Sequence, residues 1–439
     1  MTPLILNPLT MRIMKQEIYW HTTVSMPADL VPAPVPERVD VAVIGGGYTG
    51  LSAARSLAKC GVKTAVFEAE IPGWGASSRN GGMTLTGLKP SMQRVVNTFG
   101  KELASELFQY SLDSVNTVER LIREERMDCG FARTGHLQAA NKTAHFDGLK
   151  AQAEFMAREL NHEVRLVAAN DLPQEIGSRV YCGGLVDDFS AGLNPAQFAA
   201  GLLDAAQRAG AFICAQARVT RLERKENHFV LHTGRGATRS DSVLVATSGY
   251  TGNVTRNLQK RIVPIGSFII ATEKLPDETA RELSPRSRMI FDCRHFLNYF
   301  RLWDGRLVFG GRAAFFPENE NTVRKSSEIL RREMVYVFPQ LRDTNVEFAW
   351  GGTLDFAFDM LPHVGRMDGV YYSLGYAGHG VAMATHLGMK VGEAMQKGDL
   401  MEIPFARLPF PGAPLGLYNG RPWFLPFAGL WFRILDIFH

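Results

Sequence analysis

The stretch VAVIGGGYTG, residues 41–50, decides the fold, and it continues directly into LSAARSLAKCG. The apolar residues from Val39 to Ile44 predict a strand that is buried on both faces. Apolar residues at helical spacing follow, and Gly61 ends the predicted helix before a second strand, VKTAVFE. Strand, glycine turn, helix and strand together predict one βαβ unit.

The glycines of this turn have the spacing of a dinucleotide-binding loop. Gly45 permits the tight turn, Gly47 lets the backbone approach a pyrophosphate, and Gly50 lets the helix pack closely on the strand. Glu68 ends the second strand, 18 residues after Gly50, where a carboxylate accepts hydrogen bonds from an adenosine ribose and disfavours the 2′-phosphate of NADP. The turn therefore predicts a dinucleotide site, and a purely structural glycine turn is the alternative.

Length and composition set the outer limits. The 439 residues predict two intertwined domains, and a net charge of +4 excludes a nucleic-acid partner of the usual basic kind. Five scattered cysteines without a CxxC pair argue against a disulfide framework or a metal site and favour the cytoplasm. The aromatic C-terminal stretch 421–439 either packs on its own domain, which we prefer, or contacts a membrane surface.

The segment after the second strand separates FAD from NAD. A second glycine-rich loop, GWGASSRNGG at residues 73–82, replaces the alternating strands and helices of a plain NAD domain, and long helices are predicted at 101–126 and 145–159. Together with LPHVGR and GYAGHGVAMA near the end, the two loops resemble the D-amino-acid-oxidase-like family of FAD-dependent oxidoreductases. Within it, the resemblance is to the gamma-glutamylputrescine oxidoreductase branch, and it covers residues 38–400.

The resemblance implies an α/β fold, α+β overall, in which a Rossmann-like FAD-binding domain is interleaved with a substrate domain on a mixed or antiparallel sheet with helices. The expected segments are an N-terminal arm (1–37), the FAD-binding domain (38–92, 191–256 and 351–400), the substrate domain (93–190 and 257–350) and a C-terminal arm (401–439).

The resemblance also assigns cofactor residues. The first loop and Glu68 would hold the adenosine diphosphate, the second loop the pyrophosphate and the flavin edge, and the strands ARVTRLE and VLVATSG would pass near the cofactor. The implied FAD-binding residues are Gly45, Gly47, Tyr48, Thr49, Gly50, Glu68, Ala76, Ser77, Arg79, Asn80, Gly81, Gly82, Val219, Ala246, Gly378, His379, Gly380 and Val381.

Four residues are candidates for contact with the substrate. His379 lies in GYAGHG, just before a predicted helix whose N-terminal amides suit the negative charge of a reduced flavin. It acts either through its side chain or only through its backbone. Tyr299 and Arg301 alternate in a predicted strand, and the guanidinium would bind a substrate carboxylate, unless the strand arginine is simply exposed. His136 is a further pocket candidate, with a core position as its alternative.

The predicted activity is oxidation of the C–N bond of an amine or amino acid of the gamma-glutamylputrescine type. Hydride passes to flavin N5, the imine is hydrolysed, and O2 reoxidises the flavin to give H2O2. Members of the resembled family that are of the sarcosine-oxidase type tether the flavin through a late cysteine, and no cysteine follows Cys293 here, so the resemblance implies non-covalent FAD. Those members also place a lysine beside the flavin to activate oxygen. No lysine lies between Lys274 and Lys325 here, which leaves a dehydrogenase of an amine or 2-hydroxy acid with a non-oxygen acceptor as the alternative. A flavin-binding protein without enzyme activity is a further alternative. The sequence does not specify the particular substrate or the oligomeric state.

Overall fold

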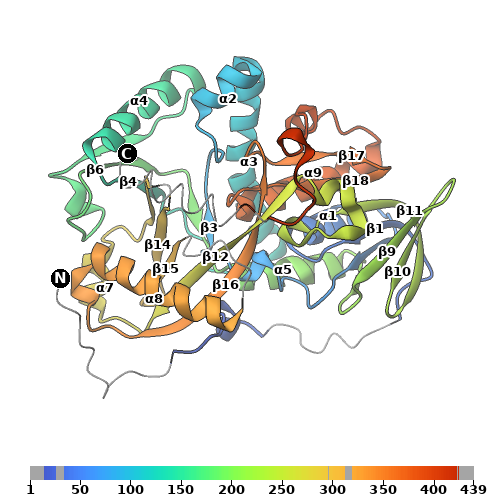
Figure 1. Cartoon of the computed structure of the whole chain (residues 1–439), viewed down its shortest axis with the longest axis horizontal. Coiled ribbons are helices and arrows are strands. Elements are labelled where there is room, and N and C mark those ends of the chain that lie inside the picture. The colour runs from blue at the N-terminus through green and yellow to red at the C-terminus, as the bar shows by residue number, and fades with distance from the viewer. Residues whose placement is uncertain (1–13, 26–33, 295, 312–318, 423, 425–439) are drawn as a thin grey trace.

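Two eight-stranded sheets dominate the structure, a computed structural model that describes residues 14–25, 34–294, 296–311, 319–422 and 424. Figure 1 shows one sheet on the right, with β1, β9, β10 and β11, and the other on the left, with β14 and β15. The predicted α/β fold class, with a Rossmann-like domain beside a second mixed sheet, is confirmed.

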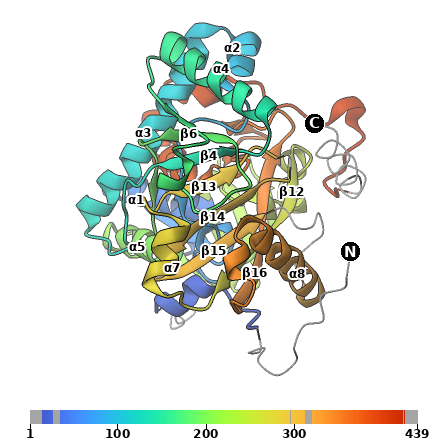
Figure 2. The same cartoon turned by 90° about the vertical axis from the view of Figure 1, so that its left-hand side faces the viewer.

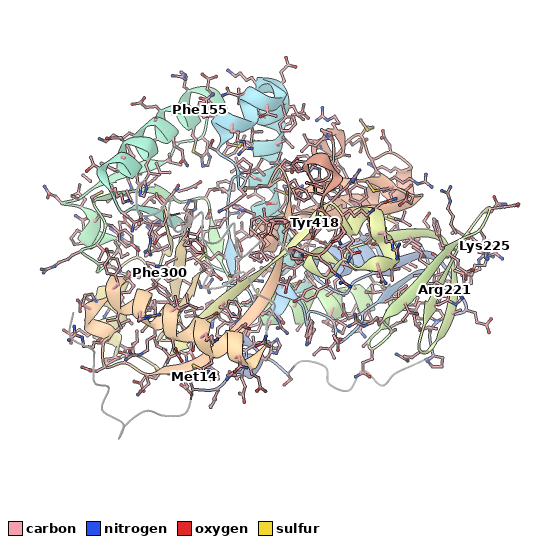
Figure 3. All side chains as sticks on the ribbon, viewed as in Figure 1. Met14, Phe155, Arg221, Lys225, Phe300 and Tyr418 are labelled. Atoms are coloured by element: carbon pink, nitrogen blue, oxygen red, sulfur yellow. The ribbon has the colours of Figure 1, made fainter. Side chains whose placement is uncertain are left out.

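The first sheet is mostly parallel and carries the βαβ unit. Its strands, in spatial order, are β17 (His363–Met367), β18 (Val370–Leu374), β11 (Gly236–Val245), β1 (Arg38–Ile44), β2 (Thr64–Phe67) and β8 (Phe212–Cys214). Strands β9 (Val219–Arg224) and β10 (Phe229–Thr233) form a hairpin that pairs with β11. This hairpin projects at the right of Figure 3, where Arg221 and Lys225 mark it.

Helices cover one face of this sheet. Helix α1 (Tyr48–Lys59) packs against α9 (Gly380–Lys397) and α5 (Pro195–Arg208), as the βαβ pattern requires. The side chain of Asn194 caps the start of α5, where it accepts two backbone N–H groups. The predicted helix at 101–126 is α3 (Lys101–Glu125), and it packs against α9 in the same core as β1.

The second sheet is mainly antiparallel. Its strands, in spatial order, are β16 (Val346–Ala357), β12 (Ile262–Thr272), β15 (Arg306–Gly311), β14 (Asn298–Trp303), β13 (Met289–Asp292), β4 (His136–Ala140), β6 (Gly183–Asp187) and β5 (Arg165–Ala168). All of them come from the two segments expected to form the substrate domain, except that β16 runs past residue 350. The hairpin between β14 and β15 turns at Asp304 and Gly305, both with positive φ.

Helices flank the second sheet as well. Helix α8 (Glu320–Val337) lies beside β16, and α4 (Thr143–Leu160), the helix predicted at 145–159, lies with α2 (Met92–Phe99) at the far end, as Figure 2 shows. Helix α7 (Asp277–Leu283) sits near β14, and the short strands β3 (Met83–Thr84) and β7 (Ala191–Gly192) pair with one another.

The described part of the N-terminal arm packs on the body of the molecule. Residues Tyr19–Thr23 form a short 3-10 helix, and Trp20 is completely buried. Lys15 forms a bridge to Phe348 in β16. Residues 425–439, for which membrane contact was the alternative, lie outside the described residues. Within the described ones, no helix has both the length and the apolar character that a membrane span requires.

Candidate active site

The first glycine loop has the geometry that its sequence predicts. Gly45 has φ +108°, and a Cβ on it would lie 2.5 Å from the carbonyl oxygen of Ala246. A Cβ on Gly50 would overlap the carbonyl of Gly45 and meet Val43 at 3.1 Å. Both positions therefore require glycine, because strand β1, helix α1 and strand β11 approach one another through the loop.

Glu68 stands at the carboxyl end of β2, beside this loop. Its Oε2 accepts the Gly46 N–H at 2.7 Å, and its Oε1 accepts the Glu70 N–H at 2.9 Å. Burial raises the pKa of the Glu68 carboxyl, while these backbone hydrogen bonds act in the opposite direction. The Ala217 N–H donates to the Glu68 carbonyl at 2.7 Å, so the chain entering β9 at Val219 begins next to the acid.

The two glycine-rich loops meet at the start of α1. The Tyr48 N–H donates to Ser77 Oγ at 3.0 Å, and the Gly73 N–H donates to the Gly46 carbonyl at 2.8 Å. The side chains of Tyr48 and Thr49 are turned into the core, where they bond Pro195 and Tyr376. The N-terminal amides of α1 and the Ser77 hydroxyl thus lie together, as a pyrophosphate site requires.

The second loop is held in place by its own side chains. Asn80 donates from Nδ2 to the carbonyls of Ala76 and Ser77 at 3.0 Å and accepts the Gly82 N–H at 2.7 Å. Arg79 is buried; its Nε donates to the Trp74 carbonyl at 2.9 Å.

The guanidinium of Arg79 also lies over the Trp74 ring, 4.5 Å from its centroid. The indole N–H of Trp350 donates to the Arg79 carbonyl at 2.8 Å. A rigid, positively charged loop therefore adjoins the start of α1.

The N-terminal arm supports this loop, which sequence reasoning missed. The Trp20 indole N–H donates to the Asn80 carbonyl at 2.8 Å, and His21 Nε2 lies 2.7 Å from Ser78 Oγ. In the sequence, only the glycines of the loop itself indicated a cofactor-binding site. An aromatic residue sixty positions upstream carries no local signal for such a contact.

The loop before α9 is tied to β16. Asp355 Oδ2 accepts the Gly375 N–H at 2.6 Å, and the Asp355 carbonyl accepts the Ala377 N–H at 2.8 Å. Burial raises the pKa of this carboxyl. Gly378 has φ +92°, and α9 begins at Gly380. These bonds hold the loop, and with it the backbone N–H groups at the start of α9, in a fixed position relative to β16.

His379 immediately precedes α9 and is partly buried. Burial lowers the pKa of its imidazole to about 3, so the ring is neutral near pH 7. Its Nδ1 is buried without a hydrogen-bond partner among the described residues. An orphaned buried nitrogen beside free helix amides fits a polar ring at this position, such as the flavin of FAD.

A cavity of about 650 Å³ lies between this loop, the second glycine loop and the second sheet. Helix α4 closes its outer side with Phe155, which is labelled in Figure 3. Several of the residues predicted from the sequence line it: Ala76, Arg79, Asn80, Gly81, His136, Tyr299, Gly378, His379 and Val381. The other predicted cofactor residues lie outside its lining: Gly45, Gly47, Tyr48, Thr49, Gly50, Glu68, Ser77, Gly82, Val219, Ala246 and Gly380.

Of the two predicted substrate residues of β14, Tyr299 lines the cavity and Arg301 does not. The Tyr299 hydroxyl lies 3.1 Å from Ser267 Oγ, and its ring faces Gly81 at the cavity wall. Arg301 is buried behind the wall, where Nη1 donates to the Gly82 carbonyl at 2.6 Å.

The guanidinium of Arg301 also stacks on Trp303 at 4.7 Å, and burial lowers its pKa to about 9. Because Arg301 supports the second loop and does not line the cavity, its position gives no support to the predicted contact with a substrate carboxylate.

Charged residues that the sequence did not single out also line the cavity. Lys89 enters from the loop after β3, and Asp187 ends β6. Asp292 and Arg294 form an ion pair at 2.8 Å on another wall. None of these residues stands in a recognisable motif, so only the folded arrangement reveals them.

Comparison with known proteins agrees with this geometry. Residues 40–394 match the family model DAO, described as FAD dependent oxidoreductase. The chain is 32% identical to gamma-glutamylputrescine oxidoreductase of Escherichia coli over 398 residues, which cover 89% of this chain and 90% of that protein. It is 30% identical to the probable oxidoreductase OrdL of Rhizobium meliloti, over 95% of this chain and 100% of that one.

Solved structures share the fold. Glycine oxidase from Geobacillus kaustophilus superposes with a TM-score of 0.70 at 20% identity, over 86% of this chain and 100% of that one. L-Proline dehydrogenase from P. horikoshii superposes with a TM-score of 0.68 at 19% identity, over 83% of this chain and 95% of that one.

The chain thus belongs to the DAO family of FAD-dependent oxidoreductases. The predicted family and the predicted enzyme class are confirmed.

Proposed function

We propose that this oxidoreductase oxidises the C–N bond of a small amine or amino acid that also carries a carboxylate, as gamma-glutamylputrescine does. The observation that carries the proposal is the presence of both signs of charge on the cavity walls, in Asp187 and Lys89. Burial alone would raise the pKa of Asp187, but the hydrogen bond from His162, the proximity of the His136 imidazole and the hydrogen bond from Thr86 lower it to about 2. A permanently ionised carboxylate favours a cationic amine over a 2-hydroxy acid.

One set of residues is suited to binding FAD, and another set to binding the substrate. Glu68 and the N-terminus of α1 suit the adenosine diphosphate half of FAD, and the N-terminal amides of α9 suit the flavin edge that gains negative charge. When bound, FAD supplies the acceptor for the hydride. Tyr299 and the apolar side chains of the cavity orient the substrate and exclude water, so that the imine product is hydrolysed after the oxidation.

We infer that FAD is held without a covalent bond. Cys293 is the cysteine of the cavity lining, and burial raises the pKa of its thiol to about 12. A protonated thiol is a poor nucleophile, which argues against a tether at that position. All five cysteines are free, which is compatible with the cytoplasmic location inferred from the sequence.

O2 is the proposed electron acceptor. The sequence lacks a lysine in the 275–324 segment, yet the fold brings Lys89 into the cavity from a different element. A positive charge near a reduced flavin favours electron transfer to oxygen through its electrostatic effect on the anion that forms. A dehydrogenase with another acceptor is the competing outcome.

An anaerobic reduction screen of the purified holoenzyme tests the function. Flavin absorbance is followed after addition of gamma-glutamylputrescine, putrescine, glycine, proline and a set of 2-hydroxy acids. We expect the amine that carries a carboxylate to bleach the flavin fastest, with putrescine slower because it cannot pair with Lys89. If only the hydroxy acids bleach the flavin, the proposal that the substrate is an amine is refuted. If no compound reduces the flavin, the protein is a flavin-binding protein without this enzyme activity. Admission of air with peroxide detection then separates oxidase from dehydrogenase.

A further inference from the structure

A buried polar cluster stands in the cavity wall, away from the glycine loops. His136 in β4 and Asp187 in β6 face one another in the antiparallel register of the two strands. Thr86 and Ser190 lie between them, and His162 lies on the far side of Asp187. All five side chains are at least nine-tenths buried. Three of them, His136, Thr86 and Asp187, line the cavity.

Hydrogen bonds connect these residues into one network. The Thr86 hydroxyl donates to Asp187 Oδ2 at 2.7 Å, and His162 Nε2 lies 2.9 Å from the same oxygen. Because the Thr86 proton is used in this bond, Thr86 Oγ1 can only accept from Ser190, whose Oγ lies 3.4 Å away. Ser190 Oγ accepts the Thr86 backbone N–H at 3.1 Å, and its single proton can point either to Thr86 Oγ1 or to His136 Nδ1.

The position of the Ser190 proton sets the tautomer of His136. When that proton points to Thr86 Oγ1, toward the charge of Asp187, Ser190 Oγ accepts the Nδ1–H of His136 at 2.8 Å. The neutral ring then carries its free electron pair on Nε2. The imidazole is held flat against Phe291, with 5.1 Å between the ring centroids, and it lines the cavity. A fixed ring with an unprotonated nitrogen is the arrangement of a general base.

We propose that His136 accepts the proton that the substrate's ammonium group must lose before oxidation, and that Asp187, through Thr86 and Ser190, is the positioning residue that keeps Nε2 free. This role rests on the proposed amine oxidation. In the step, an N–H bond of the ammonium breaks, its electron pair remains on nitrogen, and the proton forms a bond to His136 Nε2. The nitrogen pair is then available for the C=N bond as the hydride leaves the neighbouring carbon.

The need for a base follows from the substrate. Alkylamines have pKa values of about 10, so a free amine is scarce at neutral pH. Burial lowers the pKa of His136, while the charge of Asp187 acts to raise it, so the ring is neutral before the substrate arrives yet stabilised once protonated. The other titratable or charged groups around it are Asp188, Arg288, His162 and His379. His379 stays neutral, since its pKa is about 3.

Stopped-flow reduction of the holoenzyme by the best amine, measured against pH, tests the role. We expect His136→Gln to lower the rate constant for flavin reduction about 100-fold near pH 7. Its pH profile should move up to the alkylamine range near ~10. The wild-type midpoint should lie below the usual histidine value of ~6.5, because burial lowers the pKa of His136. Added imidazole should restore part of the rate in His136→Ala, which a purely structural role does not predict.

Ser190→Ala is the second variant; it removes the hydroxyl that links His136 Nδ1 to Thr86 and Asp187, and it leaves the imidazole itself in place. We expect a smaller loss and the same upward displacement of the pH profile. The matched control is His386→Gln, a buried histidine of α9 that bonds Thr117 and lies outside the cavity lining. It should leave the profile unchanged.

The outcomes separate the two proposals. Wild-type enzyme that no amine reduces overturns the proposed function and this role with it. Wild-type enzyme that an amine reduces, with an unchanged rate and pH profile in His136→Gln, overturns only the role of His136. If His136→Gln fails to retain FAD, Ser190→Ala decides, and an unaltered profile in that variant refutes the proposal.

Discussion

Replacement of Glu68 by glutamine should weaken FAD binding without unfolding the protein. The carboxylate accepts two backbone N–H groups, from Gly46 at 2.7 Å and Glu70 at 2.9 Å, one on each oxygen. An amide of the same shape offers one accepting oxygen, so its NH2 group must face one of these two donors. That leaves a buried N–H unpaired, at a cost of about 1–3 kcal/mol.

The affinity for FAD should fall as well. A ribose hydroxyl that donates to a carboxylate forms a charge-assisted bond of about 1.5–3 kcal/mol, and glutamine reduces it to a neutral bond of about 0.5–1.5 kcal/mol. The difference is about 1–1.5 kcal/mol, and since each 1.4 kcal/mol is about tenfold in affinity, we expect the Kd for FAD to rise by about 10-fold.

Titration of apoprotein with FAD, followed by quenching of flavin fluorescence, measures this change. The matched control is Glu70→Gln, because Glu70 is a half-exposed neighbour that pairs with Arg218. It should bind FAD within about twofold of wild type, as expected for a surface pair. A Glu68→Gln variant that binds FAD as tightly as the control would contradict the assignment of Glu68 to the adenosine ribose.

Three further changes test the support of the site. Trp20→Ala removes a fully buried side chain and its bond to Asn80, and chemical denaturation should show a loss of about 3–5 kcal/mol; a loss below 1 kcal/mol would contradict the packing of the arm. Arg301→Lys should lower the melting temperature but leave the dependence of rate on substrate concentration unchanged, because Arg301 lies behind the cavity wall; a raised KM would restore its predicted contact with substrate. In the folded protein Asp187 has a pKa of about 2, below the usual aspartate value of about 3.9. Its stabilisation of about 2 kcal/mol is therefore present above pH ~4 and is lost as pH falls toward 2. Asp187→Asn should therefore make the free energy of unfolding less steep over that interval, and parallel wild-type and variant curves would refute this.

Local patterns were sufficient for the first half of the site. The turn at Gly45, the close approach at Gly50 and the acid at Glu68 all lie within one βαβ unit, whose geometry follows from short-range sterics and strand–helix periodicity. The cap at Asn194 and the hairpin turn at Asp304 are equally local.

The substrate side depends on contacts between distant segments. Arg301 and Tyr299 share a strand face, and the second glycine loop meets this face. Arg301 donates to the Gly82 carbonyl of that loop, whereas Tyr299 lines the cavity. Trp20 reaches Asn80 across 60 positions, and His136 meets Ser190 across 54. Such pairings are decided by how two sheets pack, which no short window of sequence contains.

The sequence by itself therefore determined the βαβ unit, the dinucleotide loop and, through its second glycine loop, the FAD family. The tertiary structure alone decided which charges enter the cavity and which histidine joins the polar network of Asp187 there. The physical reason is that glycine spacing and hydrophobic period act over a few residues. The hydrogen-bonded network around His136 instead ends at Asp187, 51 residues away in sequence and opposite it in the sheet.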